Sequence, residues 1–152
     1  MSSSRIRQAL SEGDLITARE LLQRAYQFQG TVVQGRGLGH QLGWPTANLQ
    51  VDGRKFLPGL GVYAAWAWVD GENAALPAVM NLGPQPTVDP DSPSAVEVHL
   101  LDTRRDLEGR TLRVEPVERL RGQCRFSGLE ELSAQISRDA QQARERLQET
   151  AG

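Results

Sequence analysis

Five short segments rich in β-forming residues limit what this chain can fold into more than any other feature. Turn signals such as Asp70-Gly71 and the stretch 90–93 separate them, and Gly, Pro, Asn and Asp are the residues that tight turns favour. Several short strands joined by turns are typical of a small antiparallel barrel. We therefore predict a mainly β fold with strands at 28–34, 62–69, 75–82, 95–101 and 111–118.

Helical segments bracket this β region. Asp14 is placed to cap a short amphipathic helix that runs to about Arg24, because apolar residues recur after it at helical spacing. Ser127 and Glu130 have the spacing of a capping box, which predicts the start of a second helix. The apolar stripe of that helix should pack on the barrel, and it consists of Leu129, Leu132, Ile136, Ala140, Ala143 and Leu147.

The segment 35–48 combines a glycine-rich stretch with two oxygen-bearing side chains. Its glycines let the backbone approach a ligand closely, so that successive N–H groups can point at phosphate oxygens. Pro45 favours extended backbone, and the i, i+2 spacing then places Thr46 and Asn48 on one side. A hydroxyl and an amide oxygen in that arrangement suit Mg²⁺. The glycines are Gly35, Gly37, Gly39 and Gly43.

Neither of the common nucleotide-binding motifs explains this segment. The Gly-Lys-Ser/Thr ending of a P-loop is absent, and the glycines run GxGxGxxxG in place of GxGxxG. Taken alone, the glycines fit a plain flexible turn equally well. The Pro-Thr-Ala-Asn sequence at 45–48 moves the balance towards ligand binding.

The predicted strand 95–101 displays an acidic side chain from a rigid element. Alternation puts Glu97 and His99 on the face opposite Val96, Val98 and Leu100. A strand holds a side chain more precisely than a loop does, which suits catalysis. From the residues alone, a solvent-facing strand residue is the commoner role for Glu97. One strand histidine without a second metal-type ligand nearby is more often structural than metal-binding.

Composition excludes several classes of function. The 152 residues suit one domain with a full core, and a net charge of -2 gives no basic footprint for nucleic acid. The single Cys124 rules out an intramolecular disulfide and fits a reducing compartment. No apolar run approaches the length of a membrane span, and the first residues are too polar for a signal peptide. We expect a cytoplasmic protein with no nucleic-acid or membrane partner.

The tetrapeptide at 45–48 and the motifs that follow it resemble the riboflavin kinase family, in particular the C-terminal kinase module of bacterial bifunctional riboflavin kinase/FAD synthetases. The resemblance covers 26–147 and implies a six-stranded antiparallel Greek-key β-barrel with a C-terminal helix. The other matching segments are Gly61-Val-Tyr63, Asn81-Leu-Gly-Pro-Gln-Pro-Thr87, Val96-Glu-Val-His-Leu-Leu-Asp102, Asp106-Leu-Glu-Gly109, Arg121 and the helix after Phe126.

The resemblance implies transfer of the γ-phosphate of Mg-ATP to the ribityl 5′-hydroxyl of riboflavin, which gives FMN and ADP. Glu97 matches the family's catalytic base, which would take the proton of that hydroxyl. Thr46 and Asn48 match residues that contact Mg²⁺ and the nucleotide phosphates. At these two positions the family and the physical argument from oxygen ligands agree.

Other binding residues follow from the resemblance alone. Arg121, Phe126 and Asp139 match positions near the flavin. Without the family, they would be interpreted as a solvated arginine, a core residue that docks a helix and a surface acid. Asn81 and Thr87 should shape the site through turn hydrogen bonds. The matches on the ATP side are Gly35, Gly37, Gly39, Leu100 and Asp102, besides Thr46 and Asn48.

The first residues resemble a different part of the same family. Ser2-Ser-Ser-Arg-Ile-Arg7 is similar to the motif that closes the adenylyltransferase domain. We therefore expect 1–25 to be the residual end of that domain with its linker helix, and 26–152 to be the kinase barrel. The adenylyltransferase domain is the expected partner, and this chain should have no FAD synthetase activity. The sequence predicts no particular oligomeric state.

Some positions depart from the family pattern. Gln41, next to His40, stands where basic residues are usual, Gln85 replaces a frequent arginine, and Glu108 replaces a common tyrosine. These changes bear on nucleotide affinity more than on the type of reaction. They leave open a flavin- or nucleotide-binding module without turnover. A barrel that binds nucleic acid or protein is a third alternative, which the net charge disfavours.

Overall fold

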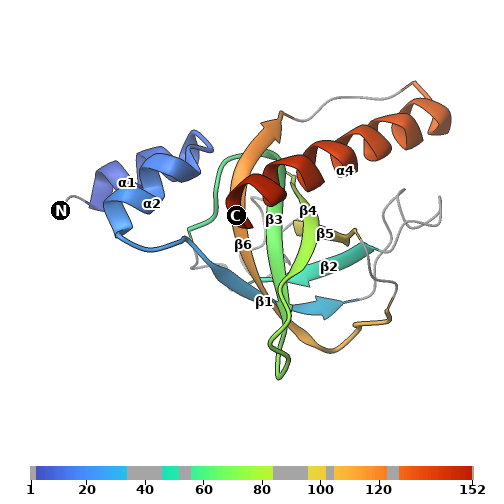
Figure 1. Ribbon diagram of the computed structural model, residues 1–152, viewed down its shortest axis with the longest axis horizontal. Helices are drawn as coiled ribbons and strands as arrows, with labels where there is room; N and C mark the ends of the chain where they lie inside the picture. The colour runs from blue at the N-terminus through green and yellow to red at the C-terminus, as the bar shows by residue number, and fades with distance from the viewer. Residues whose placement is uncertain are drawn as a thin grey trace, which may run out of the picture.

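The computed structural model of the chain is a closed β-barrel with helices at both ends of the sequence (Figure 1). It describes residues 3–33, 46–51, 56–83, 96–101, 105–122 and 127–151, with the backbone alone at Thr46, Thr150 and Ala151. The fold confirms the predicted mainly β architecture. The elements are α1 (Ser3–Ser11), α2 (Leu15–Leu22), β1 (Phe28–Val33), β2 (Thr46–Gln50), β3 (Gly61–Val69), β4 (Leu76–Leu82), β5 (Val96–Leu100), β6 (Thr111–Arg121) and α4 (Leu129–Ala151).

The strands close in the order β1-β2-β5-β4-β3-β6, and every neighbouring pair is antiparallel. β3, β4 and β5 form a meander, while β2 pairs with β5 and β6 pairs with β3. This is the predicted Greek-key arrangement. Closure leaves no unpaired sheet edge, so side chains alternate between the barrel interior and its outer surface.

Four of the predicted strands have both ends within one residue of the prediction, the fifth is longer than predicted, and one strand was missed. The five predicted segments correspond to β1, β3, β4, β5 and β6, with β6 extending to Arg121. β2 was predicted only as extended backbone after Pro45, because its five residues carry little apolar signal. Pairing with β1 and β5 makes it a strand. The helix α1 was not predicted either.

Two apolar clusters stabilise the molecule. The larger fills the barrel and includes Tyr63 and Leu49, both fully buried. The smaller lies between α4 and the outer face of β3 and β4, which α4 crosses in Figure 1. In this cluster Ala143 and Leu147 pack on Val62 and Val79. Burying a leucine side chain such as Leu147 contributes about 1.5–3 kcal/mol. The helix α4 is therefore part of the folded body and covers one side of the barrel.

The start of α4 differs in detail from the prediction. Ser127 pairs with Glu131, whose carboxylate accepts from the Ser127 backbone N at 3.0 Å and from its hydroxyl. The expected partner, Glu130, is one residue too early because the helix begins at Leu129. Leu129 was predicted to pack on the barrel, but it is 51% exposed. The packed stripe is instead concentrated in the second half of the helix.

The helices α1 and α2 are joined tightly to the barrel. Asp14 caps α2 as predicted, accepting from Thr17 N at 3.0 Å. Leu10 enters the barrel cluster, and its carbonyl accepts from Gly59 N at 2.8 Å. A Cβ at Gly59 would come within 2.2 Å of the Ser11 carbonyl oxygen, so glycine permits this close approach. In the described parts of the chain, no helix has the length and apolar character needed to cross a membrane.

Candidate functional site

A row of polar side chains crosses three neighbouring strands on the outer face of the barrel. Glu97 of β5 lies directly opposite Asn48 of β2 and directly opposite Asn81 of β4. Opposed residues in antiparallel strands share a face, with Cβ atoms about 4.5–5.5 Å apart. All three side chains are half-buried. One carboxylate is thus flanked by two amides on rigid backbone.

The surroundings of Glu97 change its acidity. Its neighbours along β5, Val96 and Val98, point into the barrel core, as the alternation predicted. Partial burial on the outer face raises the pKa of Glu97 above its ordinary value of 4.5. Desolvation has this effect because it penalises the charged form. A carboxylate with a raised pKa is a stronger proton acceptor than an ordinary surface glutamate.

His99 lies one step further along the same face of β5. It is opposite Val79 of β4 and opposite the backbone position of Thr46 on β2. Burial lowers the pKa of His99 to about 4, although Asp139 of α4 acts in the opposite direction. The imidazole is therefore neutral at pH 7. This placement agrees with the structural role that the sequence favoured.

At the end of β6, Arg121 and the buried Asp139 form a partly buried ion pair. Arg121 Nε donates to Asp139 Oδ1 at 2.9 Å, and Arg121 Nη2 donates to Oδ2 at 2.8 Å. Gln135 Nε2 also donates to Asp139 Oδ1 at 3.0 Å. Asp139 is 4% exposed, so the interpretation of this residue as a surface acid is wrong. The interpretation of Arg121 as a solvated arginine fails for a different reason: its side chain is still 23% exposed, but its guanidinium is held by the Asp139 carboxylate.

Arg121 and Glu97 belong to the same cross-strand row. Arg121 is opposite Val62 of β3, which is opposite Asn81, which is opposite Glu97. Three interstrand steps place the Cα atoms of the two residues at most about 14 Å apart. The structure therefore brings Asn48, Glu97 and Arg121 onto one outer face, and Asp139 reaches that face from α4.

Other predicted residues are not part of this arrangement. Leu100 is buried in the barrel cluster, so a contact with ATP would have to use its backbone. Asn81 lies within β4, inside the predicted strand 75–82, so the turn role expected for it does not apply. The exposed Glu108 lies in a turn, where its backbone N donates to Asp106. Lying outside the described residues are Gly35, Gly37, Gly39, His40, Gln41, Gln85, Thr87, Asp102 and Phe126.

Oxygen-bearing side chains near the start of β2 could hold Mg²⁺. Asn48 offers an amide oxygen on the outer face, next to the Glu97 carboxylate. Thr46 starts the same strand two residues earlier, and its side chain lies outside what is described. Among the described residues, no three acidic, histidine or cysteine side chains form a metal-binding group. The donors fit a cation that also takes ligands from phosphates and water, as Mg²⁺ does.

One member of the arrangement escaped the sequence argument, and another was expected to act differently. Asn81 lies in the predicted strand 75–82, but it was expected to act through turn hydrogen bonds and not as the cross-strand neighbour of Glu97. Gln135 was not singled out at all. Its signal was its spacing, because Gln135, Asp139, Ala143 and Leu147 recur every four residues and share one face of α4.

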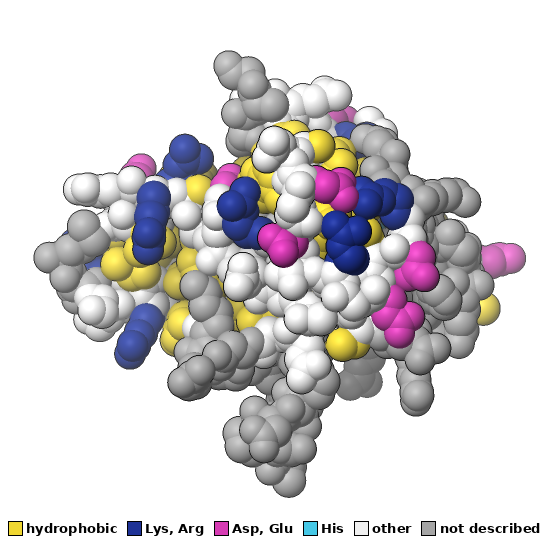
Figure 2. Space-filling model, turned by 90° about the horizontal axis from the view of Figure 1, so that it is seen from below, with side chains coloured by type: hydrophobic (Ala, Val, Ile, Leu, Met, Phe, Trp, Pro, Cys, Tyr) yellow, Lys and Arg dark blue, Asp and Glu magenta, His cyan; other side chains and the backbone are white. Residues whose placement is uncertain are grey.

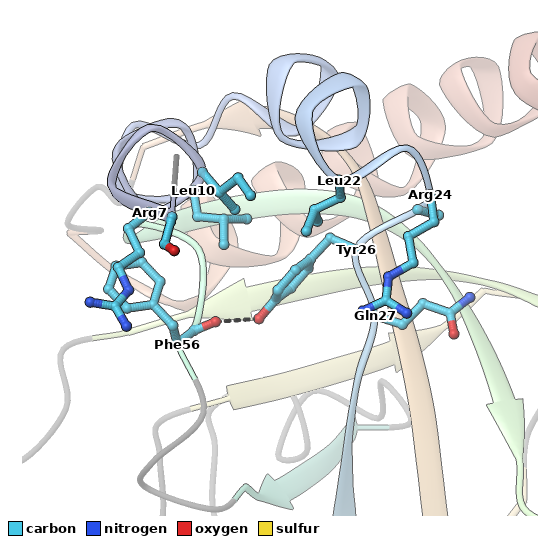
Figure 3. Close-up of a pocket in the computed structure, with 10 residues that line it drawn as sticks. Arg7, Leu10, Leu22, Arg24, Tyr26, Gln27 and Phe56 are labelled. Carbon is cyan, nitrogen blue, oxygen red and sulfur yellow. Dashed lines mark hydrogen bonds between the residues drawn. The ribbon is translucent and has the colours of Figure 1, made fainter. Parts of the chain in front are cut away.

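A second concave region lies between the N-terminal helices and the barrel. Figure 3 shows Arg7 and Leu10 of α1 on one side and Tyr26 on the other, with the Tyr26 hydroxyl donating to the Phe56 carbonyl. The cavity has a volume of about 440 Å³. The Arg7 guanidinium lies 5.9 Å from the centre of the Phe56 ring. None of the residues predicted for the site lines this groove, whose remaining residues are Ser3, Ile6, Leu22, Arg24, Ala25 and Gln27.

The fold and the row of polar side chains define a class of protein: a small closed barrel that presents a strand-borne carboxylate beside a C-terminal helix. The model for the family of flavokinases, described as riboflavin kinase, matches residues 22–147. The chain belongs to the riboflavin kinase family.

Similar proteins carry related names. The bifunctional riboflavin kinase/FMN adenylyltransferase of Escherichia coli strain K12 is 43% identical over 145 residues, covering 95% of this chain and 45% of that protein. The Bacillus subtilis protein of the same name is 38% identical, covering 94% of this chain and 45% of its own length. The chain thus spans less than half the length of these relatives and matches a kinase module.

Solved structures give the same fold. A crystal structure named as a macrolide-efflux protein from Streptococcus pneumoniae superimposes with a TM-score of 0.84 at 31% identity, covering 94% of this chain and 46% of that chain. The riboflavin kinase of Trypanosoma brucei superimposes with a TM-score of 0.55 at 24% identity, covering 80% and 79% of the two chains. The second likeness shows the fold alone.

Proposed function

We propose that this chain phosphorylates riboflavin at its ribityl 5′-hydroxyl with Mg-ATP, giving FMN and ADP. Membership of the riboflavin kinase family supports the reaction. The observation that carries the assignment to particular residues is the position of Glu97 between Asn48 and Asn81. Phosphoryl transfer depends mainly on placement and charge stabilisation, and rigid strands supply placement.

Glu97 acts as the general base. Its carboxylate accepts the proton of the 5′-hydroxyl while the hydroxyl oxygen forms a bond to the γ-phosphorus. The bond from that phosphorus to the oxygen bridging the β- and γ-phosphates breaks, and ADP leaves. The raised pKa of Glu97 matches this role, because a better proton acceptor assists the attack. Asn48 and Asn81 flank the carboxylate and restrict its orientation.

Asn48 and Thr46 would hold Mg²⁺ together with the phosphates of ATP. Their place at the start of β2, opposite Glu97 and His99, supports this role. The metal, when bound, supplies positive charge that neutralises the phosphate oxygens during transfer. The remaining predicted ATP contacts are Gly35, Gly37, Gly39, Leu100 and Asp102.

Riboflavin would place its ring system at the Arg121 side of the row and its ribityl chain towards Glu97. The Cα atoms of Arg121 and Glu97 are at most about 14 Å apart, a distance comparable to the length of a flavin with an extended side chain. Phe126 would contact the flavin as well. Because the reaction consumes ATP and the chain has a single cysteine, the proposed compartment is the cytoplasm.

Incubation of the purified 152-residue chain with riboflavin and Mg-ATP, followed by chromatography, tests the proposal. FMN should accumulate and FAD should not form, because adenylyl transfer belongs to a different part of the bifunctional relatives. Riboflavin binding without FMN formation would instead favour the flavin-binding module. Formation of FAD would contradict the proposed assignment of the chain to the kinase module.

A nucleic-acid-binding barrel is the remaining alternative. Figure 2 shows cationic and acidic side chains interspersed on the face seen from below. Near the β3–β4 hairpin, Glu72 pairs with Arg105 at 2.8 Å and with Arg110 at 3.5 Å. Acidic side chains therefore offset the arginines there. Salt-dependent binding of an oligonucleotide would be the sign of this alternative function.

A further inference from the structure

One face of α4 changes character along its length. Gln135, Asp139, Ala143 and Leu147 follow one another at four-residue intervals, so they form a single stripe. Ala143 and Leu147 belong to the apolar cluster under the helix. Gln135 and Asp139 continue the stripe with polar groups at the end of α4 that meets Arg121. The helix thus packs through apolar contacts at one end and through a polar network at the other.

Both carboxylate oxygens of Asp139 have hydrogen-bond donors within this network. Its two oxygens accept from Arg121, and Oδ1 accepts from Gln135 as well. Its exposed fraction of 4% leaves almost no surface for a ligand. Arg121 is more accessible, with 23% of its side chain exposed. A ligand that approaches this end of the row would therefore meet the guanidinium before the carboxylate.

The guanidinium is held at several points. Besides the paired contact with Asp139, Arg121 Nη1 donates to the Gly122 carbonyl at 2.9 Å. A planar guanidinium bound by both oxygens of a carboxylate has a defined plane and direction. Asp139 also acts electrostatically on His99 of β5, so its charge reaches two strands of the row. Removing Asp139 would release the orientation of Arg121 without removing Arg121 itself.

We propose that Asp139 is a positioning residue, which fixes the Arg121 guanidinium at the flavin end of the site and does not contact the flavin. Gln135 assists by holding the same carboxylate. This inference rests on the proposed riboflavin kinase function, and it replaces direct flavin contact as the role of Asp139. Since burying a charge pair costs about as much as its attraction returns, stability alone gives little reason for an ion pair here.

A double-mutant cycle separates positioning from direct contact. Arg121→Met should raise the KM for riboflavin on the order of tenfold or more, with the KM for ATP changing less than about twofold. Asp139→Asn should raise the KM for riboflavin in the wild-type background. In the Arg121→Met background, the same Asp139 substitution should have no further effect. An equal effect of Asp139→Asn in both backgrounds would overturn the proposal.

Folding is controlled by replacing the pair with apolar residues. Arg121→Met combined with Asp139→Leu removes the partly buried guanidinium together with the buried carboxylate, and this kind of exchange is often neutral or stabilising. The combined variant should keep a wild-type melting temperature and a raised KM for riboflavin. A wild-type KM in this variant would show that the pair is merely structural and would overturn the inference. Arg121→Lys should recover little affinity, because an ammonium lacks the paired geometry.

A matched control uses another ion pair between the same two elements. Arg146 of α4 lies 3.3 Å from Glu118 of β6, and both side chains are more than 40% exposed. Arg146→Gln with Glu118→Gln should leave both KM values unchanged, since exposed pairs contribute little. Riboflavin binding followed by fluorescence gives the same comparison without turnover. If the wild type made no FMN yet bound riboflavin, the proposed activity would fail and the cycle could still be measured.

Discussion

Two arginine-containing regions of the molecule, one beside α4 and one beside α1, differ in how their charges are held. Beside α4, Arg121 is paired with a carboxylate that is 4% exposed, on the face that carries Glu97. In the groove beside α1, Arg7 and Arg24 are exposed, and among the described residues no acidic side chain forms an ion pair with them. A carboxylate fixes the orientation of Arg121 in the first region, whereas in the second region Arg7 only lies 5.9 Å from the centre of the Phe56 ring. Pairing and burial, more than the presence of arginine, indicate where geometry matters.

The two regions also differ in shape. The groove has a measurable cavity of about 440 Å³, whereas the row around Glu97 is defined by strand register and by the ion pair. The chemistry points to the row, because the carboxylate, amides and guanidinium of the family motifs meet there.

The largest expected effect comes from removing the carboxylate at the centre of the row. Glu97→Gln keeps the shape of the side chain and removes the proton acceptor, so kcat should fall by roughly 10²- to 10⁴-fold. Riboflavin binding should persist. Steady-state kinetics with Glu115→Gln, another outer strand glutamate, as the control checks this difference. Near-normal turnover of Glu97→Gln would return Glu97 to the role of a strand-face residue.

The next effect concerns the start of β2. Thr46→Ala and Asn48→Ala should each weaken Mg-ATP binding on the order of tenfold, because each removes one oxygen ligand. The double variant should lose less than the sum of the two single losses, since both residues would orient the same metal and phosphate. Calorimetric titration with Mg-ATP measures this, with circular dichroism as the test of folding. Unchanged ATP affinity in both single variants would remove them from the site.

Stability should depend on pH through His99. The folded-state pKa of His99 is lowered to about 4 from 6.5, so the unfolded chain binds the proton at higher pH. This contribution to stability is present above about pH 6.5 and is lost as the pH falls towards 4, by up to about 3 kcal/mol.

Denaturant unfolding of wild type and His99→Gln at a series of pH values measures this contribution. The stability difference between the two proteins should change across that interval and be constant above it. The raised pKa of Glu97 affects the free energy of unfolding of both proteins alike, so its contribution largely cancels from their difference. Parallel pH profiles would show that His99 is not buried in its neutral form.

The smallest effect is expected in the groove. Arg7→Gln with Arg24→Gln should leave kcat and both KM values within about twofold of wild type, because exposed charges outside the site contribute little. The same assay used for Arg121→Met makes the comparison direct. A large loss of riboflavin affinity in this variant would mean that the contrast between the two regions is wrong.

Local pattern predicted most of the fold. The strands around Val98 and Val114 carry enough β-forming residues to be found by alternation, and Asp14 has the spacing of a helix cap. β2 was not found as a strand, because its assignment depends on pairing with residues far away in the sequence. Helix α1 carries mixed polar and apolar residues, and its contact with α2 and the barrel stabilises it.

The site was predicted unevenly for a related physical reason. Resemblance and strand alternation put Glu97 on an outer face, but register alone reveals that Asn48 and Asn81 are its neighbours. The burial of Asp139 could not be read from its residue type, because acidic residues are usually exposed. Its four-residue spacing from Ala143 was the available signal. The roles of all these residues remain predictions that the variants above examine.

The close approach of Gly59 to Ser11 affects the rotational diffusion expected for α1. With no room for a Cβ between them and a hydrogen bond from Gly59 to Leu10, α1 cannot swing independently of the barrel. A fluorophore attached rigidly to α1 should therefore report the slow rotational diffusion of the whole 16.7 kDa body. The anisotropy decay of that fluorophore would therefore measure the rotational correlation time of the barrel.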